Sequence, residues 1–124
     1  MGKKVASEVI DAALDYVKNN CTKITLCSAQ PTTYAEANST FALADVTVAA
    51  SDFTKAAGDV SGRKLIIGEQ SSFAIDATGT ATHVALLDVS NSKLLYVTTS
   101  AASSLTAGKN AKLLTFDIEI LQPT

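Results

Sequence analysis

The chain has 124 residues, of which 47% are hydrophobic and 18% are charged, and its formal net charge is −2. This composition predicts a folded chain rather than a disordered one, and the length suits one core but not two. Apart from Lys3-Lys4 there is no basic tract, which argues against a positive nucleic-acid-binding face. No apolar run approaches the roughly 20 residues that cross a bilayer, and Glu8 and Asp11 near the start are atypical of a signal peptide.

A helix is predicted over Ser7–Asn19, after an N-terminal arm of residues 1–6. Apolar residues recur there at helical spacing, at Ile10, Ala13, Leu14 and Val17. This narrow stripe predicts a helix that lies against a sheet. Docking on a partner is the alternative.

The two cysteines, Cys21 and Cys27, flank or lie in a predicted strand. A strand advances about 3.3 Å per residue, so their Cα atoms would lie beyond the roughly 7 Å limit of a disulfide. We therefore expect free thiols and assembly in a reducing cytoplasm. The only histidine is His83, so we expect no metal site.

The rest of the chain alternates between β-rich runs and turn-rich links. Two links are predicted to be loops: Thr32–Phe41, with one helical turn, and Ser51–Gly62, whose glycines lack phosphate-loop spacing. Ser100–Asn110 is predicted to be a connection of small residues. Strands are predicted at Thr22–Ser28, Ala44–Ala49, Arg63–Gly68, Ser71–Ala77, Thr80–Asp88, Lys93–Thr99 and Lys112–Leu121.

The hairpin Thr80–Asp88 and Lys93–Thr99 is apolar on both faces, which predicts a place at the centre of a packed sheet. In Lys112–Leu121 the alternation puts Leu114 and Phe116 on the core face. The pattern predicts a mainly β (α+β) fold: an antiparallel β-sandwich or small barrel with one N-terminal α-helix. Residues 1–124 are interpreted as a single β-rich domain.

Two groups of residues were weighed as catalytic candidates. His83 could pair with Ser72 and Asp76 across neighbouring strands, but it shares a strand face with packed apolar residues. Asp117 and Glu119 share one face of the last strand, which is the arrangement of an acid/base pair and equally of a solvated strand face. The second interpretation is favoured in both cases. We therefore predict no catalytic, cofactor-binding or metal-binding residues and no enzymatic activity.

Aromatic side chains occur in the polar middle segment, at Tyr34, Phe41 and Phe53. They are too few and too scattered for a platform that stacks sugars or bases. They are predicted to be anchors, either onto the chain's own core or into a partner's pocket.

A family resemblance accounts for several short motifs together. The segments Cys27–Tyr34, Ser61–Lys64, Gly79–Leu87, Leu95–Thr98, Leu105–Gly108 and Phe116–Glu119 resemble small virion-associated structural proteins of tailed bacteriophages. The resemblance extends over nearly the whole chain after the helix. Its motifs are turns and strands, and they contain no catalytic residue to carry over.

The resemblance implies a capsid decoration (cement) protein, located in the virion and assembled in the bacterial cytoplasm. Its implied partner is the major capsid protein, and it is expected to be a homo-oligomer such as a trimer, without nucleic acid, membrane or cofactor. A neck, tail or baseplate component is the first alternative. A receptor- or carbohydrate-binding module is the second.

Overall fold

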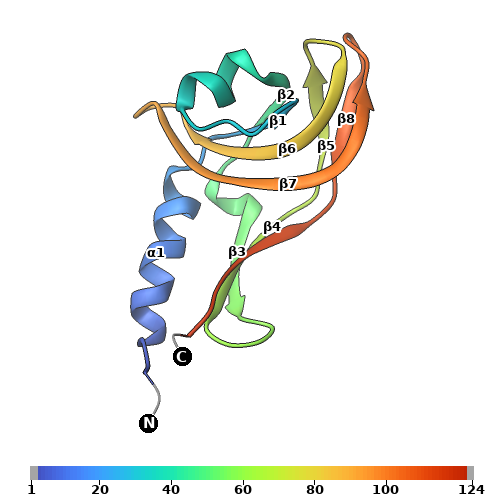
Figure 1. Cartoon of the computed structure of the whole chain (residues 1–124). Helices are drawn as coiled ribbons and strands as arrows, with labels where there is room; N and C mark the ends of the chain where they lie inside the picture. Colours follow the sequence, from blue (N-terminus) through green and yellow to red (C-terminus); the bar gives the residue numbers. More distant parts are fainter. Residues whose placement is uncertain (1–2, 123–124) are drawn as a thin grey trace.

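The computed structural model describes residues 3–122, and within them the chain forms one α-helix and nine strands in two antiparallel sheets (Figure 1). This confirms the predicted fold class of a mainly β chain with one N-terminal helix. The elements are α1 (Ser7–Asn20), β1 (Lys23–Cys27), the π-helical turn η1 (Glu36–Thr40), β2 (Ala42–Thr47), the 3-10 turn η2 (Ala50–Asp52), β3 (Phe53–Ala57), β4 (Arg63–Ile67), β5 (Gln70–Ile75), β6 (Gly79–Asp88), β7 (Lys93–Leu105), β8 (Asn110–Leu113) and β9 (Phe116–Ile120).

The larger sheet has six strands in the order β7-β6-β1-β2-β5-β8 and curls into a half-barrel (Figure 1). β6 is paired on both edges, with β1 from Lys23↔Leu87 to Cys27↔His83 and with β7 from Asp88↔Lys93 to Gly79↔Leu105. Because the sheet does not close, β7 and β8 remain its two edges.

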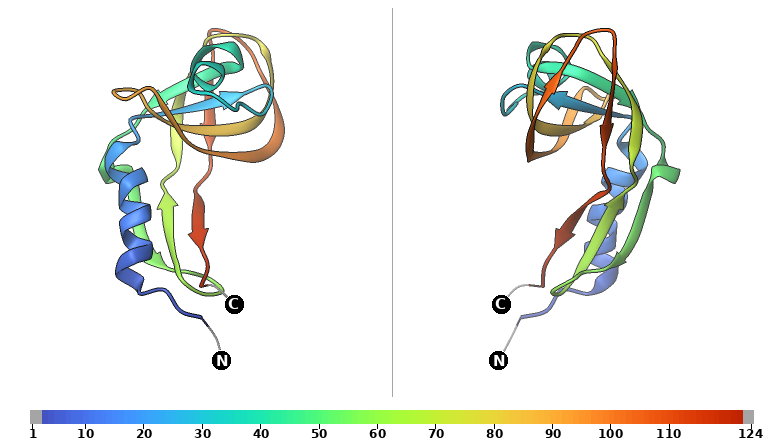
Figure 2. Two further views of the ribbon diagram at one scale, coloured as in Figure 1. Left: turned by 60° about the vertical axis from the view of Figure 1, so that its left-hand side comes forward. Right: turned by 90° about the vertical axis from the view of Figure 1, so that its right-hand side faces the viewer.

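The smaller sheet has three strands in the order β3-β4-β9 and extends from the half-barrel toward the two chain ends (Figure 2). The chain passes between the sheets three times through short links, from β2 to β3, from β4 to β5 and from β8 to β9. The two sheets are therefore joined by several covalent connections.

The helix α1 packs on the smaller sheet through Ile10 and Leu14, which are buried in the main core. Two ion pairs at its flank tie it to this sheet, from Asp11 to Arg63 and from Asp15 to Lys55, both at 2.8 Å. This confirms the predicted helix and its packing. Ala13, predicted in the buried stripe, is exposed.

The main core is continuous between the two sheets. It joins Leu65 and Ile67 of the smaller sheet to Ile24 and Val84 of the half-barrel. Among the described residues, the main core is therefore not divided between the two sheets.

A second, small core lies on the other face of the half-barrel. Cys27, Ala37, Ala85 and Leu87 form it, and Tyr34 and Phe41 pack against them. Thr25 is fully buried beside it and donates a hydrogen bond of 2.9 Å to the Ala37 carbonyl. The segment around η1 therefore covers the second face of β1 and β6, as the two-sided apolar pattern of β6 predicted.

Several further expectations from the sequence were wrong. Ser51–Gly62 is not only a loop, because it contains β3. Lys93–Thr99 is not at the centre of the sheet, because it belongs to β7, which is an edge strand. Ser100–Asn110 is not only a connection, because β7 continues to Leu105. The last predicted strand is two strands in different sheets, and the break between β8 and β9 leaves the Leu114 side chain 65% exposed.

The two chain ends run side by side. The Val5 N–H donates to Gln122 Oε1 at 2.8 Å, and Gln122 Nε2 donates to the Val5 carbonyl at 2.8 Å. The predicted N-terminal arm is thus tied to the chain's end at Val5. Met1, Gly2, Pro123 and Thr124 lie outside the described residues. Within residues 3–122 no helix has the length and apolar character that a membrane crossing requires.

Candidate functional site

A groove of about 780 Å³ lies on the open side of the half-barrel. Leu26, Ile75 and Val84, which belong to the main core, line its floor. Its two walls are residues 98–101 and 103–106 of β7 and the following turn, and residues 109–117 of β8, the link and β9. We call this feature the edge groove. Its volume lies within the range of ligand-binding pockets, about 300–1,000 Å³.

The strands that form the two walls each have one unpaired edge. β7 is hydrogen-bonded only to β6, β8 only to β5, and β9 only to β4. The tight turn at residues 106–109 connects β7 to β8, and it is held where the Gly108 N–H donates to the Ile75 carbonyl at 3.0 Å. The edge groove is thus bounded by backbone groups on both sides.

An irregularity in β7 shapes one wall. The pairing moves from Ala81↔Ser103 to His83↔Thr99, so β7 has two more residues than β6 in this interval. Ser100–Ala102 therefore bulge out of the ladder, and a bulge bends its strand. Ser100 and Ala101 line the edge groove, whereas Ala102 does not.

Beyond Lys93, the β7 edge carries none of the charged side chains or prolines that protect many edge strands. The whole segment from Leu94 to Gly108 contains no charged residue and no proline. Natural edge strands are commonly blocked by lysine, proline or a covering element, because a free edge templates pairing with another chain. Only the bulge interrupts this edge, and the exposed Leu114 side chain adds apolar surface to the opposite wall.

Charge is confined to the wall opposite β7. Lys109 and Lys112 line it, together with Asp117. Asp117 is paired with Lys64 at 3.2 Å, and Lys112 is 3.6 Å from Glu69. Among the described residues, no ion pair within 4.0 Å involves Lys109.

The structure does not bring His83 together with the residues weighed as its partners. Ser72 lies on β5, which is separated from β6 by β1 and β2, and Asp76 directly follows β5. The His83 Nδ1 atom lies 2.9 Å from the Thr82 hydroxyl oxygen. The apolar neighbours expected beside His83 on one strand face include Ala81 and Ala85, but Ala81 lies in the main core and Ala85 in the small core, so they do not share one face.

Asp117 and Glu119 are both engaged by neighbouring groups. Glu119 Oε1 accepts the Asp59 N–H at 2.8 Å and Oε2 accepts the Val60 N–H at 3.3 Å, so Glu119 caps the β3–β4 turn. Asp117 and Asp59 both bind the Lys64 ammonium, and these bonds raise the pKa of Lys64. The two carboxylates serve turn and strand contacts in this arrangement.

The two cysteines are free, as predicted, and the structure shows that both are buried. Burial raises the pKa of the Cys21 thiol from 9.0 to about 11, and burial also raises the pKa of Cys27. Thiols with raised pKa values are poor nucleophiles near neutral pH, because the thiolate is the reactive form. Within residues 3–122 no cluster of three or more His, Cys, Asp or Glu side chains could hold a metal ion.

The middle-segment aromatics are anchors onto the chain's own core. Phe53 is 2% exposed in the main core, and Tyr34 and Phe41 pack on the small core. Of the two alternatives the sequence left open, the structure supports this one. None of the three lines the edge groove.

Sequence reasoning missed the edge groove, since its walls come from strands that are edges only in the folded sheet. The one signal in the sequence was the uncharged, proline-free segment from Leu94 to Gly108. Comparisons with protein-family models, with curated proteins and with solved structures gave no match to this chain.

Proposed function

We propose that this protein is a structural component of a virus particle, a capsid decoration protein that binds the outer shell and bridges capsid subunits. The observation that carries the proposal is the edge groove, with a long edge strand that has no charged residue or proline beyond Lys93 on one wall and exposed apolar surface on the other. Free strand edges are a common means of protein–protein recognition, because main-chain hydrogen bonds supply affinity and adjacent pockets supply specificity. The resemblance of the strand and turn motifs to phage virion proteins supports the viral setting.

The proposed mechanism depends on repetition. One edge and one groove bury a modest area, and small interfaces are weak when they act alone. On a symmetric shell the same contact recurs at every lattice position, and a homo-oligomer such as a trimer engages several positions at once. Linked contacts of this kind gain affinity through effective concentration, without any new contact.

The test is the copy number per purified particle, measured by quantitative mass spectrometry against the shell protein. We expect a copy number comparable to that of the shell protein. A few copies per particle would contradict decoration and point to the neck, tail or baseplate. Absence from particles would contradict a virion role altogether.

A further inference from the structure

The edge groove has the hydrogen-bonding character of a vacant strand position. On one wall β7 presents its unpaired edge, and on the other β8 and β9 present theirs. A strand edge offers backbone donors and acceptors in alternation, and the chemical group that matches this row is another extended polypeptide. A small molecule could satisfy only a few of these groups.

The side chains of the groove are also suited to a strand. Residues in an added strand point alternately to the two faces of the sheet. One set would meet the apolar floor at Leu26 and Val84, and the other would face solvent. On the β7 wall the lining side chains Ser100, Ala101 and Ser103 are small, so a backbone can approach closely.

The charged residues of the groove wall indicate which side chains the added segment carries. Lys109 and Lys112 are on the wall opposite β7, where Asp117 is paired with Lys64 and Lys112 lies 3.6 Å from Glu69. Among the described residues no ion pair involves Lys109, so Lys109 supplies the positive charge of this wall on a chain whose formal net charge is −2. An acidic side chain in the added strand would complement these lysines.

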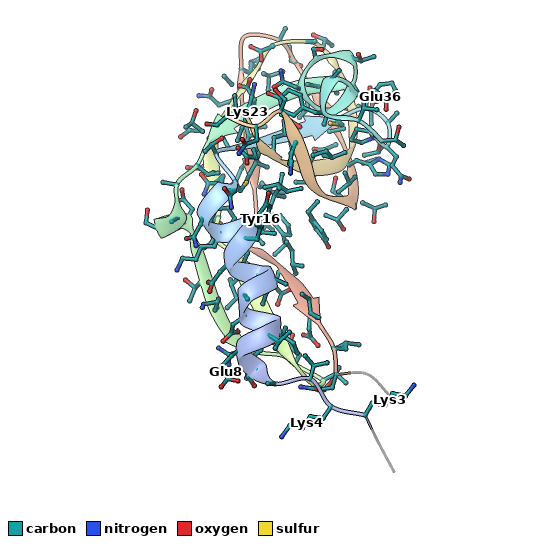
Figure 3. All side chains as sticks on the ribbon, turned by 90° about the vertical axis from the view of Figure 1, so that its left-hand side faces the viewer. Lys3, Lys4, Glu8, Tyr16, Lys23 and Glu36 are labelled. Carbon is teal, nitrogen blue, oxygen red and sulfur yellow. The ribbon has the colours of Figure 1, made fainter. Side chains whose placement is uncertain are left out.

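The same features argue against a second copy of this chain as the occupant. A second copy that paired through its own β7 edge would bring no acidic side chain to Lys109, because the segment from Leu94 to Gly108 contains no charged residue. The described part of the N-terminal arm carries Lys3 and Lys4, which the lysine wall would repel. These residues lie at the end of the molecule opposite Lys23 and Glu36 (Figure 3).

We infer that the edge groove binds an extended segment of a different protein, which adds to β7 as a strand and places an acidic residue beside Lys109 and Lys112. The inference deepens the proposed function, on which it rests for the source of the segment: a tail or linker of a shell subunit. Its test below does not depend on that source.

The probe is an end-blocked eight-residue peptide in which valine and threonine alternate and one aspartate stands near each end. A matched peptide carries lysine in place of each aspartate. Binding is measured by titration followed by NMR, together with hydrogen exchange of the backbone amides. We expect the acidic peptide to protect amides within residues 98–105 and to bind at least tenfold more tightly than the basic one.

Two variants form a matched pair. Ala101 and Ala102 are both exposed and both lie in the bulge, but only Ala101 lines the edge groove. We expect Ala101→Lys to weaken binding of the acidic peptide more than tenfold and Ala102→Lys to change it less than twofold. Lys109→Glu should reverse the preference between the two peptides. A thermal melt verifies that each variant is folded.

Several results would overturn the inference. They are failure of both peptides to bind, equal binding by the two lysine variants, and no preference for the acidic peptide. Protection of β7 amides that increases with protein concentration without peptide would identify a second copy as the occupant. If the peptide fails while particles contain many copies, only this inference falls; if it binds while particles contain none, only the proposed function falls.

Discussion

Thr25 is the buried polar side chain that joins the small core to the half-barrel. It is fully buried, and its hydroxyl donates to the Ala37 carbonyl at 2.9 Å, which fixes the η1 segment over β1. A valine of similar shape would leave that carbonyl with only the weak Cys27 Sγ donor at 3.8 Å, and a poorly satisfied buried group costs about 1–3 kcal/mol.

We therefore predict that Thr25→Val lowers the free energy of unfolding by about 1–3 kcal/mol in urea titrations. Thr54→Val is the control, because Thr54 is an exposed strand residue and surface substitutions usually stay within about 0.5 kcal/mol. Equal stability of the two variants would show that the hydroxyl bond contributes nothing.

Cys21 links stability to pH at the alkaline end. Burial raises its pKa from 9.0 to about 11, so the folded state retains a proton that the unfolded state releases. The resulting stabilisation is fully present below pH 9 and is lost as the pH rises through about 11.

The expected result is that the unfolding free energy decreases between pH 9 and pH 11 more steeply in the wild type than in Cys21→Ala. Urea unfolding at several pH values measures both slopes, and groups common to the two proteins cancel in the comparison. The cavity in the variant lowers its stability by a constant amount and does not alter the slope. Parallel curves would contradict the pKa shift.

Among the elements, the β3–β4 turn is packed closely against β9. Gly62 has φ of +68°, and a Cβ atom there would collide with the Ile120 carbonyl of β9. Gly108, in the β7–β8 turn, also has a positive φ of +88°, but no atom lies within 4 Å of the position of its Cβ. Substitutions at these two glycines therefore distinguish the cost of backbone strain, which both share, from the cost of steric crowding, which only Gly62 has.

Gly108→Ala should cost about 1–2 kcal/mol, the strain of a left-handed residue alone. Gly62→Ala should cost clearly more, because the turn must also move away from β9. Thermal or urea unfolding of both variants gives the comparison. If both substitutions cost the same, the contact between this turn and β9 is not tight in solution.

The sequence predicted α1 and the alternating strand β5 well, because in each a regular apolar period matches one buried face. The sequence-based prediction failed for elements whose limits and neighbours depend on contacts with distant parts of the chain. β3 was missed because Lys55 and Ala56 show no alternation, and the end of β7 was missed because Ser103 and Ser104 are small and polar on either face. Leu114 fits the period of its neighbours but lies in the break between two sheets.

The candidate site was beyond sequence reasoning for a related physical reason. Whether a strand is central or an edge depends on which distant strands pair with it, and local composition does not encode that. The apolar pattern of Thr80–Asp88 correctly indicated cover on both faces. The similar pattern of Lys93–Thr99 placed it wrongly in the centre, although only β6 pairs with it.

At the scale of the whole molecule, the question is whether the half-barrel and the smaller sheet unfold together. The main core includes Leu65 of β4 and Ile24 of β1 in one continuous cluster, and three links join the sheets. A shared core predicts one cooperative transition rather than two independent ones.

Leu65→Ala tests this prediction. Leu65 is fully buried in the smaller sheet, and leucine-to-alanine substitutions in cores cost about 2–5 kcal/mol. If the molecule is one cooperative unit, the slowest amides of β1 and β6 in the half-barrel should lose the same protection free energy as those of β4. Ile66→Ala, on the opposite face of β4 and only partly buried, is the matched control and should have a smaller effect in both regions. Loss of protection confined to β3, β4 and β9 would mean that the smaller sheet opens alone, and that α1 with this sheet can move independently of the half-barrel.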